Sequence, residues 1–116
     1  MREISSRRQN IDVLIREPDS GIYNAMNKGI RAATNDVIGI LNSDDRYVHP
    51  TVLRDVSAVL GDPNIDACYS DLIYRNEHGL ITRTWIAGKN SRINWHLGWM
   101  PPHPTFFVKK TVYDMY

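Results

Sequence analysis

The sequence has little cysteine, little net charge and no long apolar run. Its single cysteine, Cys68, cannot form a disulfide within the chain, and because no nearby pattern supplies a base we expect a buried thiol rather than a nucleophile. A net charge of +1 creates no field that would attract nucleic acid or an acidic membrane surface. No apolar run approaches the roughly 18 residues that a transmembrane helix needs, so we expect no membrane span.

The first residues also lack the apolar segment of a signal peptide. Met1, Arg2 and Glu3 lead into further polar residues, so we expect no secretory signal. We therefore expect a cytoplasmic protein, either free or peripheral at the inner face of the membrane. The chain has 116 residues, 42% of them hydrophobic and 23% charged. That composition suits one packed domain and does not indicate disorder.

The spacing of apolar residues predicts alternating strands and helices. Alternation over 11–16 predicts a strand, and a stripe with helical spacing predicts a helix that begins at Gly21 and buries one face. The stripe consists of Ile22, Ala25, Met26, Gly29, Ile30 and Ala33. Further along, we expect a strand at 37–41, a helix from 51 to 60, a strand at 65–74 with a hairpin partner at 80–86, a strand at 105–108 and a helix from 109. Residues 94–100 suit either a short helix or an aromatic loop. The order predicts an α/β fold with at least a partly parallel sheet.

The strand predicted at 37–41 ends in Asn42, Ser43, Asp44 and Asp45. Open α/β sheets place ligands beyond the carboxyl ends of their strands, and two adjacent carboxylates call for a counter-charge such as a hard divalent cation. The alternative is a pair of solvated loop residues that cap the following helix. The local pattern leaves both interpretations open.

Three longer stretches resemble glycosyltransferase family 2, in its bacterial polysaccharide-assembly branch. The first runs from Glu17 to Gly29 (EPDSGIYNAMNKG), the second is Leu41 to Asp45 (LNSDD), and the third is Met100 to Val108 (MPPHPTFFV). The resemblance implies a partial GT-A fold, the fold of nucleotide-sugar transferases, as a single domain over residues 1–116. That fold has a mixed, mostly parallel sheet with flanking helices and a hairpin.

The resemblance also implies a metal site. Asn42, Ser43 and Asp44 occupy the positions of a DXD motif whose first acid is Asn in this chain. Asp44 and Asp45 are then the candidate ligands of Mg²⁺ or Mn²⁺ on the donor's diphosphate, with Asp45 also a candidate for the donor sugar's hydroxyls. A divalent ion there neutralises the charge that develops as the nucleoside diphosphate departs. One or two carboxylates are enough for Mg²⁺, because phosphate and water complete its coordination.

Other residues receive roles by the same resemblance. Asn24, Lys28 and Asn42 join the two acids as candidate donor-binding residues, and Asn24 stands where the family usually has Asp. For Lys28, as for Arg31, a solvated helix face is the alternative. His103 is a candidate on the acceptor side, and its alternative is a loop histidine fixed by neighbouring prolines.

The resemblance assigns no catalytic residue within the chain. The family's nucleotide-binding strand is not recognisable before Ile11, and the general base of inverting members is expected beyond Tyr116. Such a base contributes about 10²–10⁴-fold to the rate, so we expect little or no activity from this polypeptide alone. Unpaired sheet edges favour self-association, so we also expect either a homo-oligomer or a marginal fold.

Two functions remain. The first, which these motifs favour, is the metal-dependent transfer of a sugar, with inversion, from a nucleotide-sugar donor to a glycan or lipid-linked acceptor. The second is a non-catalytic remnant or binding module. A metal hydrolase built from Asp44, Asp45, His96 and His103 lacks the ligand spacing of such sites. Trp85, Trp95 and Trp99 could either stack on an acceptor or pack the hairpin against the core.

Overall fold

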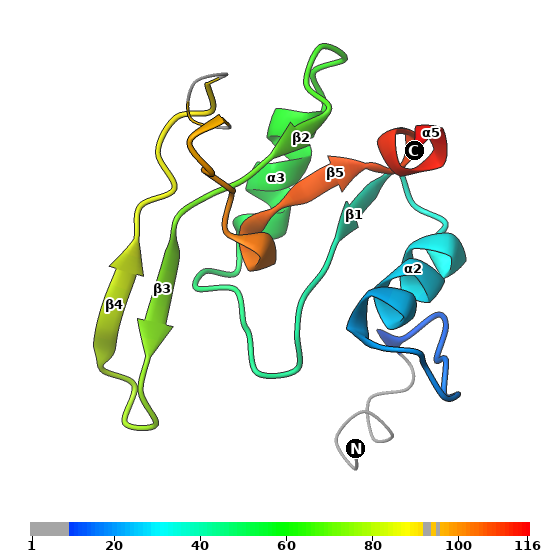
Figure 1. The fold of residues 1–116 in the computed structure, drawn as a ribbon, viewed down its shortest axis with the longest axis horizontal. Coiled ribbons are helices and arrows are strands. Elements are labelled where there is room, and N and C mark those ends of the chain that lie inside the picture. The colour runs from blue at the N-terminus through cyan, green and yellow to red at the C-terminus, as the bar shows by residue number, and fades with distance from the viewer. Residues whose placement is uncertain (1–9, 92–93, 95) are drawn as a thin grey trace. The chain divides into compact units, whose positions relative to one another are not determined.

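The computed structural model describes residues 10–91, 94 and 96–116 and divides into two compact units, Met1–Thr34 and Asn35–Tyr116. In the first unit an irregular segment leads into helix α2, Ile22–Ala32 (Figure 1). Gly21 precedes the helix with φ 117°, a backbone conformation that other residues rarely adopt. The helix predicted from the stripe is therefore confirmed.

Two expectations for this unit are wrong. Residues 11–16 form no strand, because no described strand pairs with them, and Val13, Leu14 and Ile15 are each at least 40% exposed. The stripe of α2 is not buried either: no residue of the helix is buried, and Ile22 is 61% exposed. Among residues 10–34, which the structure describes in this unit, an irregular segment is the one neighbour of the helix, and the apolar face stays partly open.

The second unit contains a three-stranded sheet in the order β1-β5-β2. Its strands are β1 (Val37–Gly39), β2 (Ala67–Cys68) and β5 (Phe107–Lys109). Helix α3, Val52–Leu60, connects β1 to β2 and contacts β2 (Figure 1). The predicted strand at 37–41, helix at 51–60 and strand at 105–108 are thus present with shifted ends.

The expected α/β class is confirmed, but the expectation of mostly parallel pairing is wrong for the described strands. β5 pairs antiparallel with both β1 and β2, so β1 and β2 run in the same direction without pairing with each other. Because a helix connects β1 to β2, the sequence predicted that these two strands would pair in parallel. The last strand of the chain takes the place between them, and no periodicity in the sequence shows that insertion.

The core of this unit lies along β5. Phe107 and Val108 are 5% and 4% exposed, and Ile38 and Leu60 are also buried. Ile38 lies opposite Val108, and Gly39 lies opposite Phe107. A Cβ atom added at Gly39 would lie 2.5 Å from Cε1 of Phe107, so the ring occupies the space that a side chain would need. Glycine at 39 is required by this close approach.

The second sheet is a hairpin of β3 (Leu72–Arg75) and β4 (Ile81–Trp85). The hairpin is as predicted, but the single strand expected at 65–74 is wrong, because it divides into β2 and β3. At the break, Ser70 N donates to Thr105 Oγ1 at 3.2 Å, and Thr105 Oγ1 contacts Ser70 O at 2.8 Å. A side chain thus satisfies the backbone groups that a continuous strand would have paired.

Two short helices flank β5. The 3₁₀ helix η2, His103–Thr105, precedes the strand, and helix α5, Lys110–Met115, follows it and contacts it. The expected terminal helix is confirmed. Among the described residues, no helix has the length and apolarity that a membrane-spanning helix needs.

Candidate functional site

The acidic residues predicted as the metal site lie in a turn that follows β1. Asp45 N donates to Asn42 O at 3.1 Å, which closes the turn, and Asn42 Nδ2 donates to Asp45 Oδ2 at 3.0 Å. Asp45 is half-buried, whereas Asp44 is exposed. The amide of Asn42 therefore orients one carboxylate oxygen of Asp45, while Asp44 extends into solvent.

The carboxylates of Asp44 and Asp45 suit a cation whose remaining coordination positions are filled by phosphate and water. The described residues contain no group of three or more His, Cys, Asp or Glu side chains that could hold a metal ion. Mg²⁺ commonly uses one or two protein carboxylates and takes its other oxygens from substrate and water. Two adjacent aspartates meet that requirement but cannot enclose an ion by themselves. The hydrolase alternative with His96 and His103 is not assembled in the described part of the chain.

Lys28 lies among acceptors of the segment that precedes its helix. Its Nζ atom is 2.7 Å from Glu17 Oε1, 2.7 Å from Asp19 Oδ1 and 3.1 Å from Pro18 O. Hydrogen bonds to Asp19 first and Glu17 second raise the pKa of Lys28, so the ammonium stays charged. An ammonium has three N–H donors, and these three acceptors engage them. Lys28 thus connects residues 17–19 to α2.

Two other predicted residues have simpler surroundings. Asn24 lies half-buried on α2, and its backbone N donates to Gly21 O at 3.1 Å. His103 is exposed at the start of η2, where its carbonyl oxygen accepts from Phe106 N at 3.2 Å. Asn24 and Lys28 belong to the first unit, whereas His103 and the acidic turn belong to the second.

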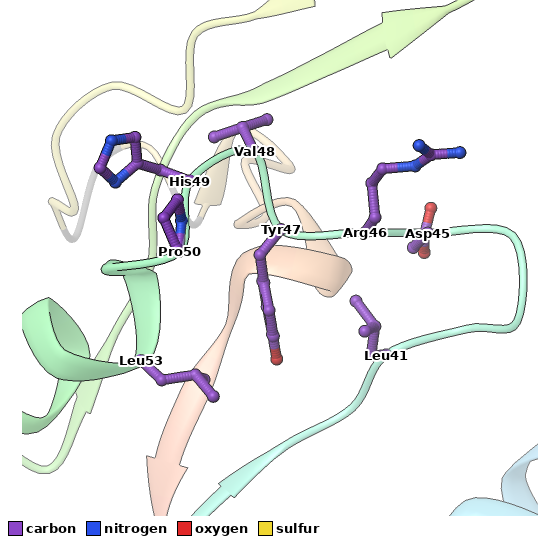
Figure 2. A pocket seen from close by; sticks show the side chains of 8 residues that line it. All are labelled: Leu41, Asp45, Arg46, Tyr47, Val48, His49, Pro50 and Leu53. Atoms are coloured by element: carbon purple, nitrogen blue, oxygen red, sulfur yellow. The ribbon is translucent and has the colours of Figure 1, made fainter. Parts of the chain in front are cut away.

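A pocket of about 500 Å³, which no sequence pattern predicted, lies beside the acidic turn (Figure 2). Its apolar lining comes from Leu41, Tyr47, Val48, Pro50 and Leu53, and its polar lining from Asp45, Arg46 and His49. The Tyr47 ring lies 6.1 Å from the Phe107 ring between centroids. Burial raises the pKa of the Tyr47 phenol, which therefore stays neutral. Most of the lining residues follow the acidic pair directly in the sequence, and that position is the one signal that could have indicated the pocket.

A chain of polar contacts fixes one end of this loop. His49 Nδ1 lies 2.8 Å from Thr51 Oγ1, and Thr51 Oγ1 donates to Asp55 Oδ2 at 2.9 Å. Asp55 lies in the first turn of α3, where a carboxylate also interacts favourably with the helix dipole. The imidazole is thus oriented from the helix through Thr51.

Of the tryptophans that the structure describes, Trp99 contacts residues of its own unit. Trp99 Nε1 donates to Ala87 O at 2.6 Å, and its ring meets Tyr69 edge-on at 5.3 Å between centroids. Trp85 is half-buried at the end of β4, and Trp95 lies outside the described residues. Cys68 is half-buried on β2, and burial raises the pKa of its thiol, which disfavours a nucleophilic thiolate.

Comparison with known proteins decides the family. The sequence profile of glycosyl transferase family 2 matches residues 1–111, which is nearly the whole chain. The chain belongs to glycosyltransferase family 2. The predicted family is therefore confirmed, and the observed mixture of helices and strands is consistent with a partial GT-A fold.

Curated relatives of this family 2 chain match shorter stretches. A PGL/p-HBAD biosynthesis glycosyltransferase of Mycobacterium bovis (strain BCG / Pasteur 1173P2) is 34% identical over 65 residues, which cover 55% of this chain and 25% of the relative. An uncharacterised glycosyltransferase of Mycobacterium tuberculosis (strain CDC 1551 / Oshkosh) is 43% identical over 44 residues, 38% of this chain and 17% of the relative. The chain thus matches about a quarter or less of these relatives' lengths. No solved structure matches it significantly.

Proposed function

We propose that this family 2 chain carries the donor-side turn of a glycosyltransferase. The enzyme would move a sugar from a nucleotide-sugar donor to a glycan or lipid-linked acceptor, with inversion at the transferred carbon. The observation that carries the proposal is the turn from Asn42 to Asp45, which follows β1 by two residues, in a chain matched by the family profile over residues 1–111.

In this proposal Asp44 and Asp45 hold Mg²⁺ or Mn²⁺ on the donor's diphosphate. The ion, when bound, supplies positive charge to the phosphate oxygens that become more negative as the sugar leaves. Asn42 keeps Asp45 oriented through the 3.0 Å hydrogen bond, so the carboxylate need not reorganise on binding. Asp44 is exposed and can approach the ion without breaking any contact within the described residues.

The remaining predicted residues keep their roles as proposals. Asn24 is placed on the donor side and His103 on the acceptor side by the family resemblance alone. A direct contact of Lys28 with the diphosphate would require it to leave Glu17 and Asp19, both at 2.7 Å. Lys28 therefore serves the donor side best by holding residues 17–19 against the helix that carries Asn24.

Calorimetry with UDP-glucose and GDP-mannose, each with and without MnCl₂, tests the proposal. We expect Mn²⁺-dependent binding of at least one donor. Asp44→Ala should weaken it at least about tenfold, which corresponds to about 1.4 kcal/mol. Glu77→Gln is the matched control, because Glu77 is an exposed acid in the turn between β3 and β4, far in sequence from the acidic turn.

A second readout isolates the metal. Paramagnetic Mn²⁺ should broaden the backbone amide resonances of Asp44 and Asp45 in the wild type and do so much less in Asp44→Ala. A folded protein that binds neither donor would support the alternative of a non-catalytic module. Donor binding that survives Asp44→Ala unchanged would contradict the metal role of that residue.

Self-association is a separate proposal. β1 and β2 form the two outer strands of the three-stranded sheet, and unpaired edges can pair with a second chain. Sedimentation velocity over a range of concentrations should show a dimer, and a monomer at all concentrations would contradict this proposal.

A further inference from the structure

The pocket beside the acidic turn has an apolar interior. Figure 2 shows the Tyr47 side chain between those of Leu41 and Leu53. Leu41 is 43% exposed and Leu53 is 56% exposed, although both line the same concave surface. Water in such a pocket finds few hydrogen-bond partners on these side chains, so an apolar ligand group gains free energy by displacing it.

The polar residues of the pocket lie on one stretch of the same loop. Asp45 and Arg46 contribute one negative and one positive charge, and His49 is oriented by Thr51 at 2.8 Å. Asp45 and Arg46 have opposite formal charges, so the lining has no excess of positive charge that would attract a nucleoside diphosphate by itself. A hydroxyl-rich sugar ring placed against Leu41 and Leu53 would lose hydrogen bonds to water. The apolar part of a ligand belongs there, with its hydroxyl groups near the polar residues.

Asp45 connects the pocket to the donor side. It closes the turn with Asn42 and also lines the pocket. A ligand in the pocket therefore adjoins the carboxylate proposed to contact the metal or the donor sugar. The reaction needs an acceptor hydroxyl at that position, because sugar transfer requires the two substrates to be neighbours.

We propose that this pocket binds the apolar aglycone of the acceptor, an alkyl or aryl group next to the hydroxylated part that receives the sugar. The proposal rests on the proposed function and selects a lipid-linked or aryl glycoside over a free glycan. Leu41, Tyr47 and Leu53 contact the aglycone, whereas Asp45 and His49 bind hydroxyl groups at the polar side.

Three neutral probes test the proposal on the full chain: methyl, phenyl and n-hexyl β-D-glucopyranoside. Each is titrated without nucleotide or metal, below the micelle concentration of the hexyl compound, and binding is followed through backbone amide shifts. We expect the hexyl and phenyl compounds to bind at least tenfold more tightly than the methyl compound, since one buried methylene increases affinity roughly fourfold. The shifts should concentrate at residues 41, 45–49 and 53.

Matched variants of α3 locate the site. Leu53 and Val59 are exposed apolar residues of the same helix, at 56% and 45%, but only Leu53 lines the pocket. Leu53→Gln should weaken hexyl glucoside binding roughly fivefold or more, and Val59→Gln should leave it unchanged. Val48→Gln is a second pocket variant at a residue that is 69% exposed, so its folding is not expected to suffer.

The possible results separate this inference from the proposed function. Equal affinities for the three glucosides, shifts outside the pocket, or equal effects of Leu53→Gln and Val59→Gln would overturn the aglycone site. Donor calorimetry is independent of these titrations. Donor binding without an aglycone preference would overturn this inference alone. An aglycone preference without donor binding would overturn the donor proposal, and the pocket would then be a glycoside-binding site without a role in sugar transfer.

Discussion

Two segments that carry the family resemblance are stabilised by different forces. In the segment from Glu17 to α2, no helix residue is buried, and Lys28 joins the preceding residues through two ion pairs at 2.7 Å. In the sheet that supports the acidic turn, β5 places Phe107 and Val108 at 5% and 4% exposure. The first segment depends on charge and the second on apolar burial.

The difference has consequences for solution behaviour. Ion pairs near the surface are weakened by salt and depend on the protonation of both partners. The stabilisation from apolar burial depends much less on salt and on protonation. We therefore expect residues 17–28 to lose order under conditions that leave the acidic turn and its sheet intact.

The largest expected effect is in the sheet. Phe107→Ala removes a buried ring on the central strand and should lower the free energy of unfolding by about 3–5 kcal/mol. Leu80→Ala is the control, because Leu80 is 66% exposed beside the hairpin turn, and it should change stability by less than about 0.5 kcal/mol. Urea denaturation followed by circular dichroism measures both. Similar losses for the two variants would contradict a core centred on β5.

Gly39→Ala tests the close approach between β1 and β5. The new Cβ would lie 2.5 Å from Phe107 Cε1, so the ring must move, at a cost of about 1–3 kcal/mol. The double variant Gly39→Ala/Phe107→Leu should lose less free energy of unfolding than the sum of the two single losses, because both substitutions act on the same contact. Additive losses in the same urea experiment would show that the two residues act independently.

Lys28→Met should have a smaller effect, confined to the first unit. It keeps the apolar stem but removes the ammonium that contacts Glu17 and Asp19. Hydrogen exchange should become faster at 17–28 and stay unchanged in the sheet. Arg31→Met is the matched control on the same helix, since Arg31 is exposed. Unchanged exchange in Lys28→Met would refute the role of these ion pairs.

The pH dependence of that segment follows from the same contacts. Hydrogen bonds to Asp19 and Glu17 raise the pKa of Lys28 above its ordinary value. The stabilisation is therefore complete below the ordinary lysine pKa and disappears as the pH rises through the raised one. Chemical shifts of the Lys28 side chain should report the titration. A pKa that does not change on unfolding in urea would contradict this prediction.

Local patterns predicted most of the elements. The helical spacing from Ile22 to Ala33 indicated α2, and the alternation and turn residues around Asn76 indicated the hairpin. The predicted strand at 11–16 failed because alternation shows which face a strand could bury but provides no pairing partner. The expected parallel pairing failed because the position of β5 depends on contacts between residues far apart in sequence.

The candidate site divides in the same way. Asp44 and Asp45 were identified from their position after an apolar run and from a family motif, and their roles remain predictions. The ion pairs of Lys28 were not foreseen, although Glu17 and Asp19 stand in the same motif. The pocket around Tyr47 was missed altogether, because its lining is drawn from both sides of the loop and from α3.

The sequence alone determined the family, the α/β class and the location of the acidic pair, because these depend on residue types at short spacings. The tertiary structure alone decided that β5 separates β1 from β2, that Phe107 requires glycine at 39, and that Leu41, Tyr47 and Leu53 line one pocket. These outcomes depend on how side chains of distant segments fill space. Short-range patterns carry little information about such packing.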